Sequence, residues 1–200
     1  FRTKYTGGVL PVFLKLLVVW LDPFTITWFR FLTAGILMAP VLLSRHGTAG
    51  LKIRGTPLLV VGIVGLCGNY VIFLTGLRYI SPGTSQVIIQ LAPMMVLLGA
   101  LVLFKEPFRG VQWLGLGLLV VGLGLFFNMR YGVLLYEFGK YSTGVLLVAL
   151  SAVFWAVYIL AQKQILIYMK PEGVLLYVYF FGSTLLLPMA HPGRVLDLDG

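Results

Sequence analysis

The sequence predicts an all-α polytopic membrane protein: a helical bundle of about seven transmembrane helices, in which the start of an inverted second unit follows a first five-helix unit. The composition, the apolar segments and an internal repeat carry this prediction. Apolar residues make up 60% of the chain, charged residues only 10%, and the mean hydropathy is +1.00. Soluble domains usually contain about 25% charged residues, so the composition excludes an ordinary soluble domain.

Polar or helix-breaking residues separate the apolar segments. A hydrocarbon core about 30 Å thick needs about 20 helical residues to cross it. Asp22 and Pro23 divide the first two segments, and 44–57 is the longest polar loop. Pro and Gly in 78–85 and 105–110 are typical of tight turns, 128–142 is a mixed connector, and 169–173 contains another Pro. The predicted helices are 5–21, 24–44, 57–78, 83–104, 110–128, 141–168 and 173–190.

The positive charges are unevenly distributed between the two sides of the predicted bundle. Loops after the second, fourth and sixth segments hold more Lys and Arg than the others, which places them and the N-terminus in the cytoplasm. The net charge of +9 comes from scattered single cations, so we expect the lipid bilayer as a partner and no nucleic acid. Cys67 is the single cysteine, which excludes an intrachain disulfide and a cysteine metal cluster.

The chain repeats itself at an offset of 148 residues, because Lys and Pro recur at that spacing. Since five predicted crossings precede the restart, the second unit would enter the membrane from the opposite side, as in inverted-repeat transporters. We therefore expect a first unit over 1–133, truncated at its N-terminal end, and the start of a second over 134–200, as part of a ten-helix protein. The matched pairs are Lys15 with Lys163, Pro23 with Pro171, Pro40 with Pro188, Phe29 with Tyr177 and Phe31 with Tyr179.

Several motifs, in order along the chain, resemble the EamA-type transporters of the drug/metabolite transporter superfamily. They begin with "LDPFTITWFRFLTAGILMAP" and continue from "GNYVIFLTGLRYISPG" to "LGLGLLVVGLGLFF". The matching residues are Asp22-Pro23, Arg30-Phe31-Leu32, Leu91-Ala92-Pro93, Glu106, Gln112-Trp113-Leu114-Gly115, Gly122, and Trp155 with Lys163.

The resemblance implies ten helices in two inverted five-helix units around a central cavity. It also implies transport of small metabolites, amino acids or drugs, frequently outward, in the plasma membrane. Three positions depart from the family pattern: Gly7 replaces a Trp, Lys105 replaces a Gly and Ala92 replaces a Ser. The Gly7 departure weakens any aromatic contribution of the first helix to the cavity.

Polar and aromatic residues inside the predicted helices are the candidates for lining that cavity. Gln86 and Gln90 share a helix face with Pro93, which should kink the helix and free a carbonyl around Ile89. Amide side chains also join helices structurally, and aromatic residues also anchor helices at membrane interfaces. Both alternatives remain open for the further candidates, which are Asn69, Phe73, Ser151, Trp155 and Tyr158. The glycines of 57–78 and 110–128 are more simply explained by close helix packing.

Arg30 is a cation inside the predicted helix 24–44, about 10 Å from Pro23 at about 1.5 Å per residue. It either reaches the headgroups with its long side chain or faces the cavity and binds an anion such as a substrate carboxylate. Its position in the repeat is occupied by Val178, so the architecture does not require a cation there.

These observations favour a permease that works by alternating access on a small-molecule substrate. The predicted segments contain no Asp or Glu for an ion to titrate, and Glu106 is expected to be a solvated or loop-ordering charge. HExxH and GxSxG are not present, and His46 and His191 fall in loops on opposite sides. We therefore expect no enzyme activity, no catalytic or metal site and no cofactor. A non-transporting scaffold or accessory subunit is the main alternative, an intramembrane enzyme is a weaker one, and a homodimer stays open.

Overall fold

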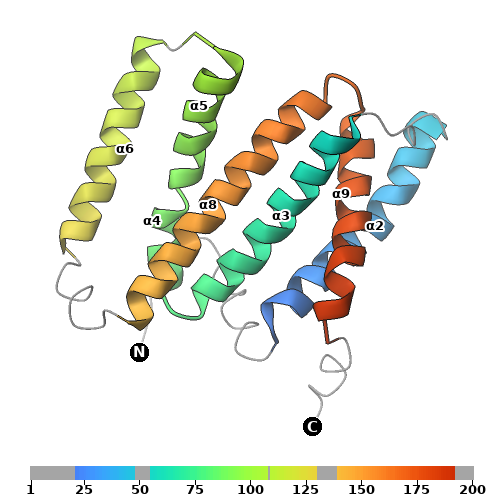
Figure 1. The fold of residues 1–200 in the computed structure, drawn as a ribbon, viewed down its shortest axis with the longest axis horizontal. Coiled ribbons are helices and arrows are strands. Elements are labelled where there is room, and N and C mark those ends of the chain that lie inside the picture. Colours follow the sequence, from blue (N-terminus) through green and yellow to red (C-terminus); the bar gives the residue numbers. More distant parts are fainter. Residues whose placement is uncertain (1–20, 48–54, 108, 130–138, 192–200) are drawn as a thin grey trace.

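The computed structural model describes residues 21–47, 55–107, 109–129 and 139–191, and its regular elements within these ranges are all helical. The predicted all-α fold is therefore confirmed (Figure 1). The predicted first helix, 5–21, falls outside the described residues apart from Leu21. The elements are α2 (Pro23–His46), α3 (Thr56–Leu77), α4 (Pro82–Ile88), α5 (Leu91–Phe104), α6 (Gly110–Met129), α8 (Lys140–Ile165), α9 (Pro171–Leu186) and the 3₁₀ helix η2 (Leu187–Met189).

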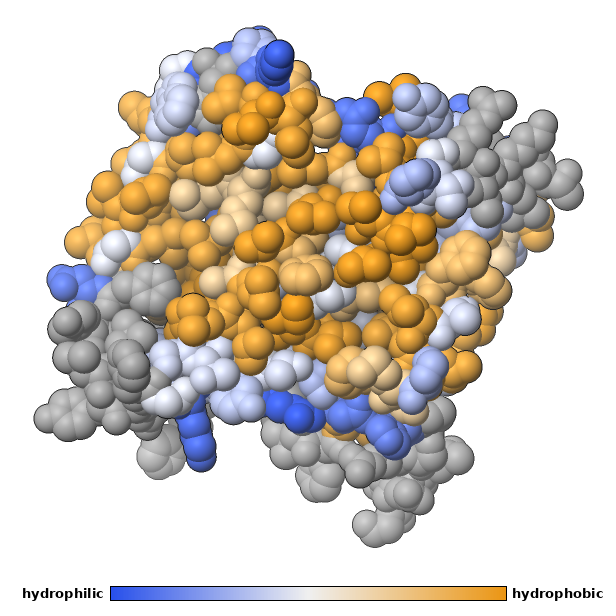
Figure 2. Space-filling model, in the orientation of Figure 1, coloured by the Kyte–Doolittle hydropathy of each residue, from blue (hydrophilic) through white to orange (hydrophobic). Residues whose placement is uncertain are grey.

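The helices form a membrane-spanning bundle. Five spans are long and apolar enough to cross a bilayer when α4 and α5 are taken together, and the described part of α6 is a shorter apolar helix. Hydrophobic residues form a broad band across the face shown in Figure 2, with hydrophilic residues at its upper and lower margins. The hydrocarbon core of a bilayer favours apolar surface, and the headgroup regions on either side favour polar residues. The chain is therefore an integral membrane protein.

The predicted segment 83–104 is confirmed as one membrane span, Pro82–Phe104, but the span is not a continuous helix, because it divides into α4 and α5 at Ile89 and Gln90. Pro93 has no N–H to bond the carbonyl of Ile89, so the break lies where the kink was predicted. That carbonyl is not free, however, since it accepts a hydrogen bond from the Ala92 N–H at 2.9 Å. The other described helices begin and end within about one turn of their predicted bounds, although His46 ends α2 instead of lying in the following loop.

Glycine allows α3 and α8 to approach closely. A Cβ added at Gly65 would lie 3.0 Å from the Tyr158 backbone nitrogen and 3.1 Å from the Phe154 carbonyl oxygen. Nearer the other end, Gly76 and Gly144 face each other's carbonyl oxygens in the same way, at 3.2 Å. These contacts agree with a packing role for the α3 glycines.

The glycines of α6 behave differently. A Cβ added at any of them would meet nothing within 4 Å in the described part of the chain, so their predicted packing role is not seen there. These residues are Gly110, Gly115, Gly117, Gly122 and Gly124.

The helices α2 and α9 pack against each other in opposite directions (Figure 1). At one end, Arg45 near the end of α2 forms an ion pair with Glu172 in the first turn of α9, with an N–O distance of 3.4 Å. At the other end, the backbone N–H of His191 donates to Thr25 Oγ1 at 2.8 Å. Between them the rings of Phe31 and Tyr179, which the 148-residue offset pairs, lie 5.6 Å apart.

Asp22 caps the N-terminus of α2. Its carboxylate accepts hydrogen bonds from the Thr25 backbone N–H at 2.9 Å and from the Thr25 hydroxyl at 2.6 Å. Partial burial raises the pKa of this carboxyl group, but the Thr25 hydrogen bonds and nearby His191 together bring the pKa below its ordinary value. Asp22 therefore favours the charged state that caps a helix best.

Candidate functional site

A polar cavity of about 320 Å³ lies beside the break between α4 and α5, with walls from α2, α3, α4, α5 and α8. Its volume is at the lower end of the range typical of small-molecule sites. Seven predicted candidates line it, which are Arg30, Asn69, Phe73, Gln86, Gln90, Pro93 and Trp155. Tyr70, Ile89 and Ala92 complete the lining.

The break positions the two glutamines of the cavity. Gln86 lies in α4, and Gln90 lies in the turn that precedes α5. The turn is held by the Ile89 N–H, which donates to the Ser85 carbonyl at 2.9 Å, and by the Ala92 contact described above. Because irregular backbone at membrane depth is tolerated where it lines protein or a cavity, this turn fits a binding region.

Asn69 attaches α3 to α8 at the edge of the cavity. It is 6% exposed, and its Nδ2 donates to the Ser151 carbonyl at 2.8 Å. The Ser151 hydroxyl is fully buried and donates to the Val148 carbonyl at 2.7 Å, so its side chain takes part in helix packing and does not line the cavity. Asn69 therefore has a structural hydrogen bond as well as a place in the lining.

The predicted polar face of α8 is divided between two environments. Trp155 lines the cavity, whereas Tyr158 is buried against α3 and contacts Gly65. Their ring centroids lie 5.5 Å apart, so the Tyr158 ring packs against the Trp155 ring. Tyr158 is not an interfacial anchor, because it belongs to the main hydrophobic core.

Arg30 points into the cavity over an aromatic ring. Its guanidinium carbon lies 4.6 Å from the centroid of the Tyr70 ring, within cation–π distance. The Nη1 atom is buried and has no hydrogen-bond partner among the described residues. Phe31 holds the Tyr70 ring by an edge-to-face contact, with centroids 5.5 Å apart. Tyr70 was not predicted, and its only sequence signal is its place next to Asn69.

A second cavity, of about 440 Å³, lies between α5 and α8. It shares Pro93 and Trp155 with the polar cavity and extends to Glu106 and Lys163. These two charged residues form an ion pair that joins the end of α5 to the end of α8. Glu106 thus orders a helix junction, and the two cavities adjoin at Pro93 and Trp155.

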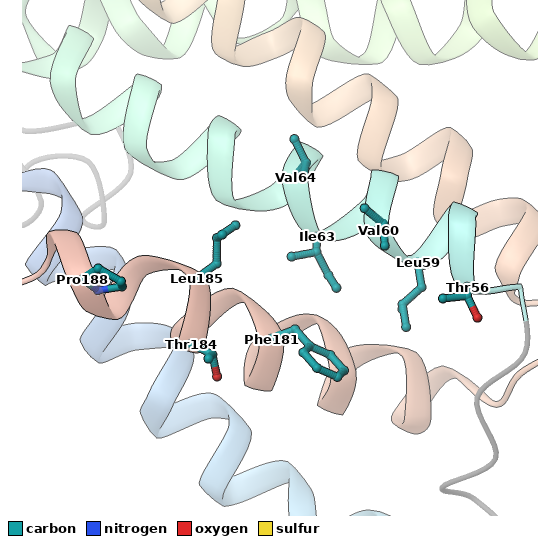
Figure 3. Close-up of a pocket in the computed structure, with 9 residues that line it drawn as sticks. All are labelled: Thr56, Leu59, Val60, Ile63, Val64, Phe181, Thr184, Leu185 and Pro188. Carbon is teal, nitrogen blue, oxygen red and sulfur yellow. The ribbon is translucent and has the colours of Figure 1, made fainter.

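The groove between α3 and α9 is larger, about 640 Å³, but has a different character (Figure 3). Aliphatic and aromatic side chains from both helices line it, and among the described residues its polar side chains are those of Thr56 and Thr184. The Thr184 hydroxyl already donates to the Phe180 carbonyl. Because a solute site needs a few polar groups to orient its ligand, the smaller polar cavity is the better candidate.

The fold and the cavity together define a polytopic α-helical membrane protein with a polar cavity of solute size inside its helical segments. Residues 6–128 match the EamA-like transporter family. The chain belongs to this family, which confirms the resemblance read from its motifs.

Similar proteins cover almost the whole chain. An uncharacterized transporter of Haemophilus influenzae is 33% identical over 198 residues, covering 98% of this chain and 64% of its own length. The uncharacterized inner membrane transporter YhbE of Escherichia coli K12 is 32% identical over 201 residues, covering 98% and 63%. The chain thus spans less than two thirds of these relatives. Together with the spanning helices, the inner-membrane relative supports a plasma-membrane location. No solved structure matches the chain.

Proposed function

We propose that this chain forms part of a permease that moves small organic solutes, such as metabolites, amino acids or drugs, across the plasma membrane in the export direction. The polar cavity beside the α4–α5 break carries the proposal. It combines amide, guanidinium and aromatic groups within an apolar bundle, where unused polar groups are costly. Transport of a solute gives these groups a function that a scaffold would not need, and nothing in the lining supplies hydrolytic chemistry.

The mechanism we propose is alternating access between two inverted units, 1–133 and 134–200, the second continuing in the full-length protein. The antiparallel contact of α2 with α9 supports this division, because Phe31 and Tyr179 have matching places in the two units and touch each other. Residues near an axis that relates two units meet their own counterparts in this way. Rocking of one unit against the other would expose the cavity to each side in turn.

The broken helix supplies a place for movement. The turn at Ile89 and Gln90 interrupts the hydrogen bonds of the span, so α5 can tilt relative to α4 without breaking a continuous helix. Tilting of α5 away from α8 would open the second cavity beside Glu106 and Lys163. Because the basic residues at this end are predicted to be cytoplasmic, this is the path by which we propose solutes enter for export.

Flux through the full-length protein tests the proposal. Purified protein would be reconstituted into liposomes, and movement of labelled amino acids, organic acids and hydrophobic amines would be followed in both directions. We expect saturable flux of at least one class, lost in protein-free liposomes. Absence of flux across the whole panel, from protein that retains its thermal unfolding transition, would refute transport.

A further inference from the structure

The position of Arg30 is the starting point. Its Nη1 atom is buried in the cavity wall, and its guanidinium carbon lies over the Tyr70 ring. The side chain therefore does not extend to the lipid headgroups, which is the usual way for an arginine near a helix end to keep its charge hydrated. Arg30 instead presents a cation to the interior of the bundle.

Among the described residues, the lining of the cavity contains no acidic side chain to balance that cation. Its other polar groups are the amides of Asn69, Gln86 and Gln90, the hydroxyl of Tyr70 and the indole N–H of Trp155. The face of an aromatic ring compensates a buried cation only in part, and a buried charge without a counter-charge is strongly unfavourable. Within the described residues, the cavity thus has one excess positive charge, carried by a guanidinium whose buried Nη1 has no hydrogen-bond partner.

The geometry of the unused group limits what can satisfy it. A guanidinium is a planar set of N–H donors that matches the two oxygens of a carboxylate. Gln86 and Gln90 contribute further amide groups to the lining, beside the helix break. One of the two N–H donors of the Asn69 amide is already committed to the Ser151 carbonyl, whereas both glutamine amides can serve as additional donors.

The rest of the lining is apolar and partly aromatic. Phe73, Pro93 and Trp155 form this part of the wall, together with Ile89 and Ala92. A ligand that fills the cavity must therefore carry one anionic end and one apolar body. A cationic ligand would meet Arg30 without any acid in the lining to attract it.

We propose that the cavity binds an organic carboxylate, with the anionic group on the Arg30 guanidinium and the apolar body between Phe73 and Trp155. Tyr70 is a positioning residue that holds the guanidinium in the cavity. This inference rests on the proposed function and names its substrate class as amphipathic organic anions.

A matched pair of ligands tests the charge requirement. Phenylacetate and phenylacetamide have the same apolar body and nearly the same shape but differ in charge. Titration calorimetry on the full-length protein should show phenylacetate binding at least about 10-fold more tightly, since hydrogen bonds to charged groups are the stronger ones. Equal binding of the two, or binding of neither, would overturn the inference.

Variants at two arginines of α2 locate the effect. Arg30→Gln should weaken phenylacetate binding by about 10- to 100-fold, leave phenylacetamide unchanged, and be partly rescued by Arg30→Lys. Arg45→Gln is the matched control, because Arg45 lies on the same helix but is largely exposed and outside the cavity. The same loss in both variants would exclude a specific role for Arg30.

Chemical protection gives a readout that needs no variant. Phenylglyoxal modifies accessible arginines, and mass spectrometry would report the rate at Arg30 and at Arg45. Phenylacetate should slow modification of Arg30 at least about threefold and leave Arg45 unaffected, while phenylacetamide should protect neither. Protection of both arginines, or of neither, contradicts the inference.

Flux measurements separate this inference from the proposed function. Transport of neutral or cationic solutes with no carboxylate preference would refute the anion site and leave transport intact. Carboxylate binding that depends on Arg30, without flux of any solute, would refute transport and leave the anion site intact.

Discussion

Replacement of Gly65 by alanine tests the close approach of α3 and α8. The new Cβ would lie 3.0–3.1 Å from three atoms of α8, and two of these are the backbone nitrogen of Tyr158 and the carbonyl oxygen of Phe154. Backbone atoms cannot rotate away as side chains do, so the helices must separate. Overpacking of this kind typically costs about 1–3 kcal/mol.

Part of that cost is offset by helix propensity. Alanine is more favourable than glycine in a helix interior by about 1 kcal/mol, so the net destabilisation from Gly65→Ala should be about 0–2 kcal/mol. For a domain of about 150–250 residues, each kcal/mol shifts Tm by about 2–4 °C. We therefore expect Tm of the full-length protein in detergent to fall, by up to about 8 °C.

Gly62→Ala is the matched control on the same helix. Its Cβ would meet the nearest atoms of Ile165 and Tyr158 at 3.8 and 3.9 Å, which is ordinary contact. Only the gain in helix propensity, about 1 kcal/mol, remains, and Tm should rise by roughly 2–4 °C. Equal Tm values for the two variants would show that α3 and α8 are not packed at the distance described.

Three further predictions concern helix ends and the helix break. Lys105 ends α5 with φ 51°, a left-handed conformation that favours glycine, so Lys105→Gly should raise the stability by about 0.5–1 kcal/mol; an unchanged or lower Tm would contradict this. The pKa of Asp22 is lower in the folded protein than its ordinary value of 3.8. The ionised Asp22 carboxylate therefore stabilises the fold above pH 3.8, and this contribution is lost as the pH falls through the pKa of the folded state. Asp22→Asn keeps a capping side chain that does not titrate. When the pH is lowered below 3.8, the Tm of this variant should therefore decrease less than the Tm of the unmodified protein. Equal decreases in Tm would show that the Asp22 carboxylate does not stabilise the fold. Pro93→Ala restores an N–H for the Ile89 carbonyl, so Tm should rise while the flux rate falls; a rise in both would argue against a hinge at the break.

The helical framework could be predicted because each helix carries its own local signals. Pro23 and Pro171 both begin helices, as their fixed φ and missing N–H favour. Pro93 predicted the position of the break. It did not predict that the chain would form two helices there, or that the Ile89 carbonyl would accept a hydrogen bond. Whether the proline bends or divides a helix depends on the neighbouring helices, which the local sequence does not describe.

The cavity was predictable only in part. The spacing of Gln86, Gln90 and Pro93 placed them on one face, and the structure brings all three to the cavity. The same reasoning placed Ser151 beside Trp155, yet Ser151 faces the interior of the α3–α8 pair. Helical spacing says which residues share a face but not which helix covers each part of that face. Tyr70 was missed for this reason, because its contact with Arg30 exists only when α2 and α3 are packed.

The pairing of α2 with α9 also constrains how the protein is made. The Arg45–Glu172 and His191–Thr25 contacts join residues 127 and 166 positions apart in the chain. At a synthesis rate of about 5–20 residues per second, α2 waits on the order of ten seconds before α9 is complete. During that time Phe31, which is 2% exposed in the finished structure, can pack on Tyr70 of α3 but lacks its contact with Tyr179 of α9. The packing of α2 is therefore complete only after α9 has been made.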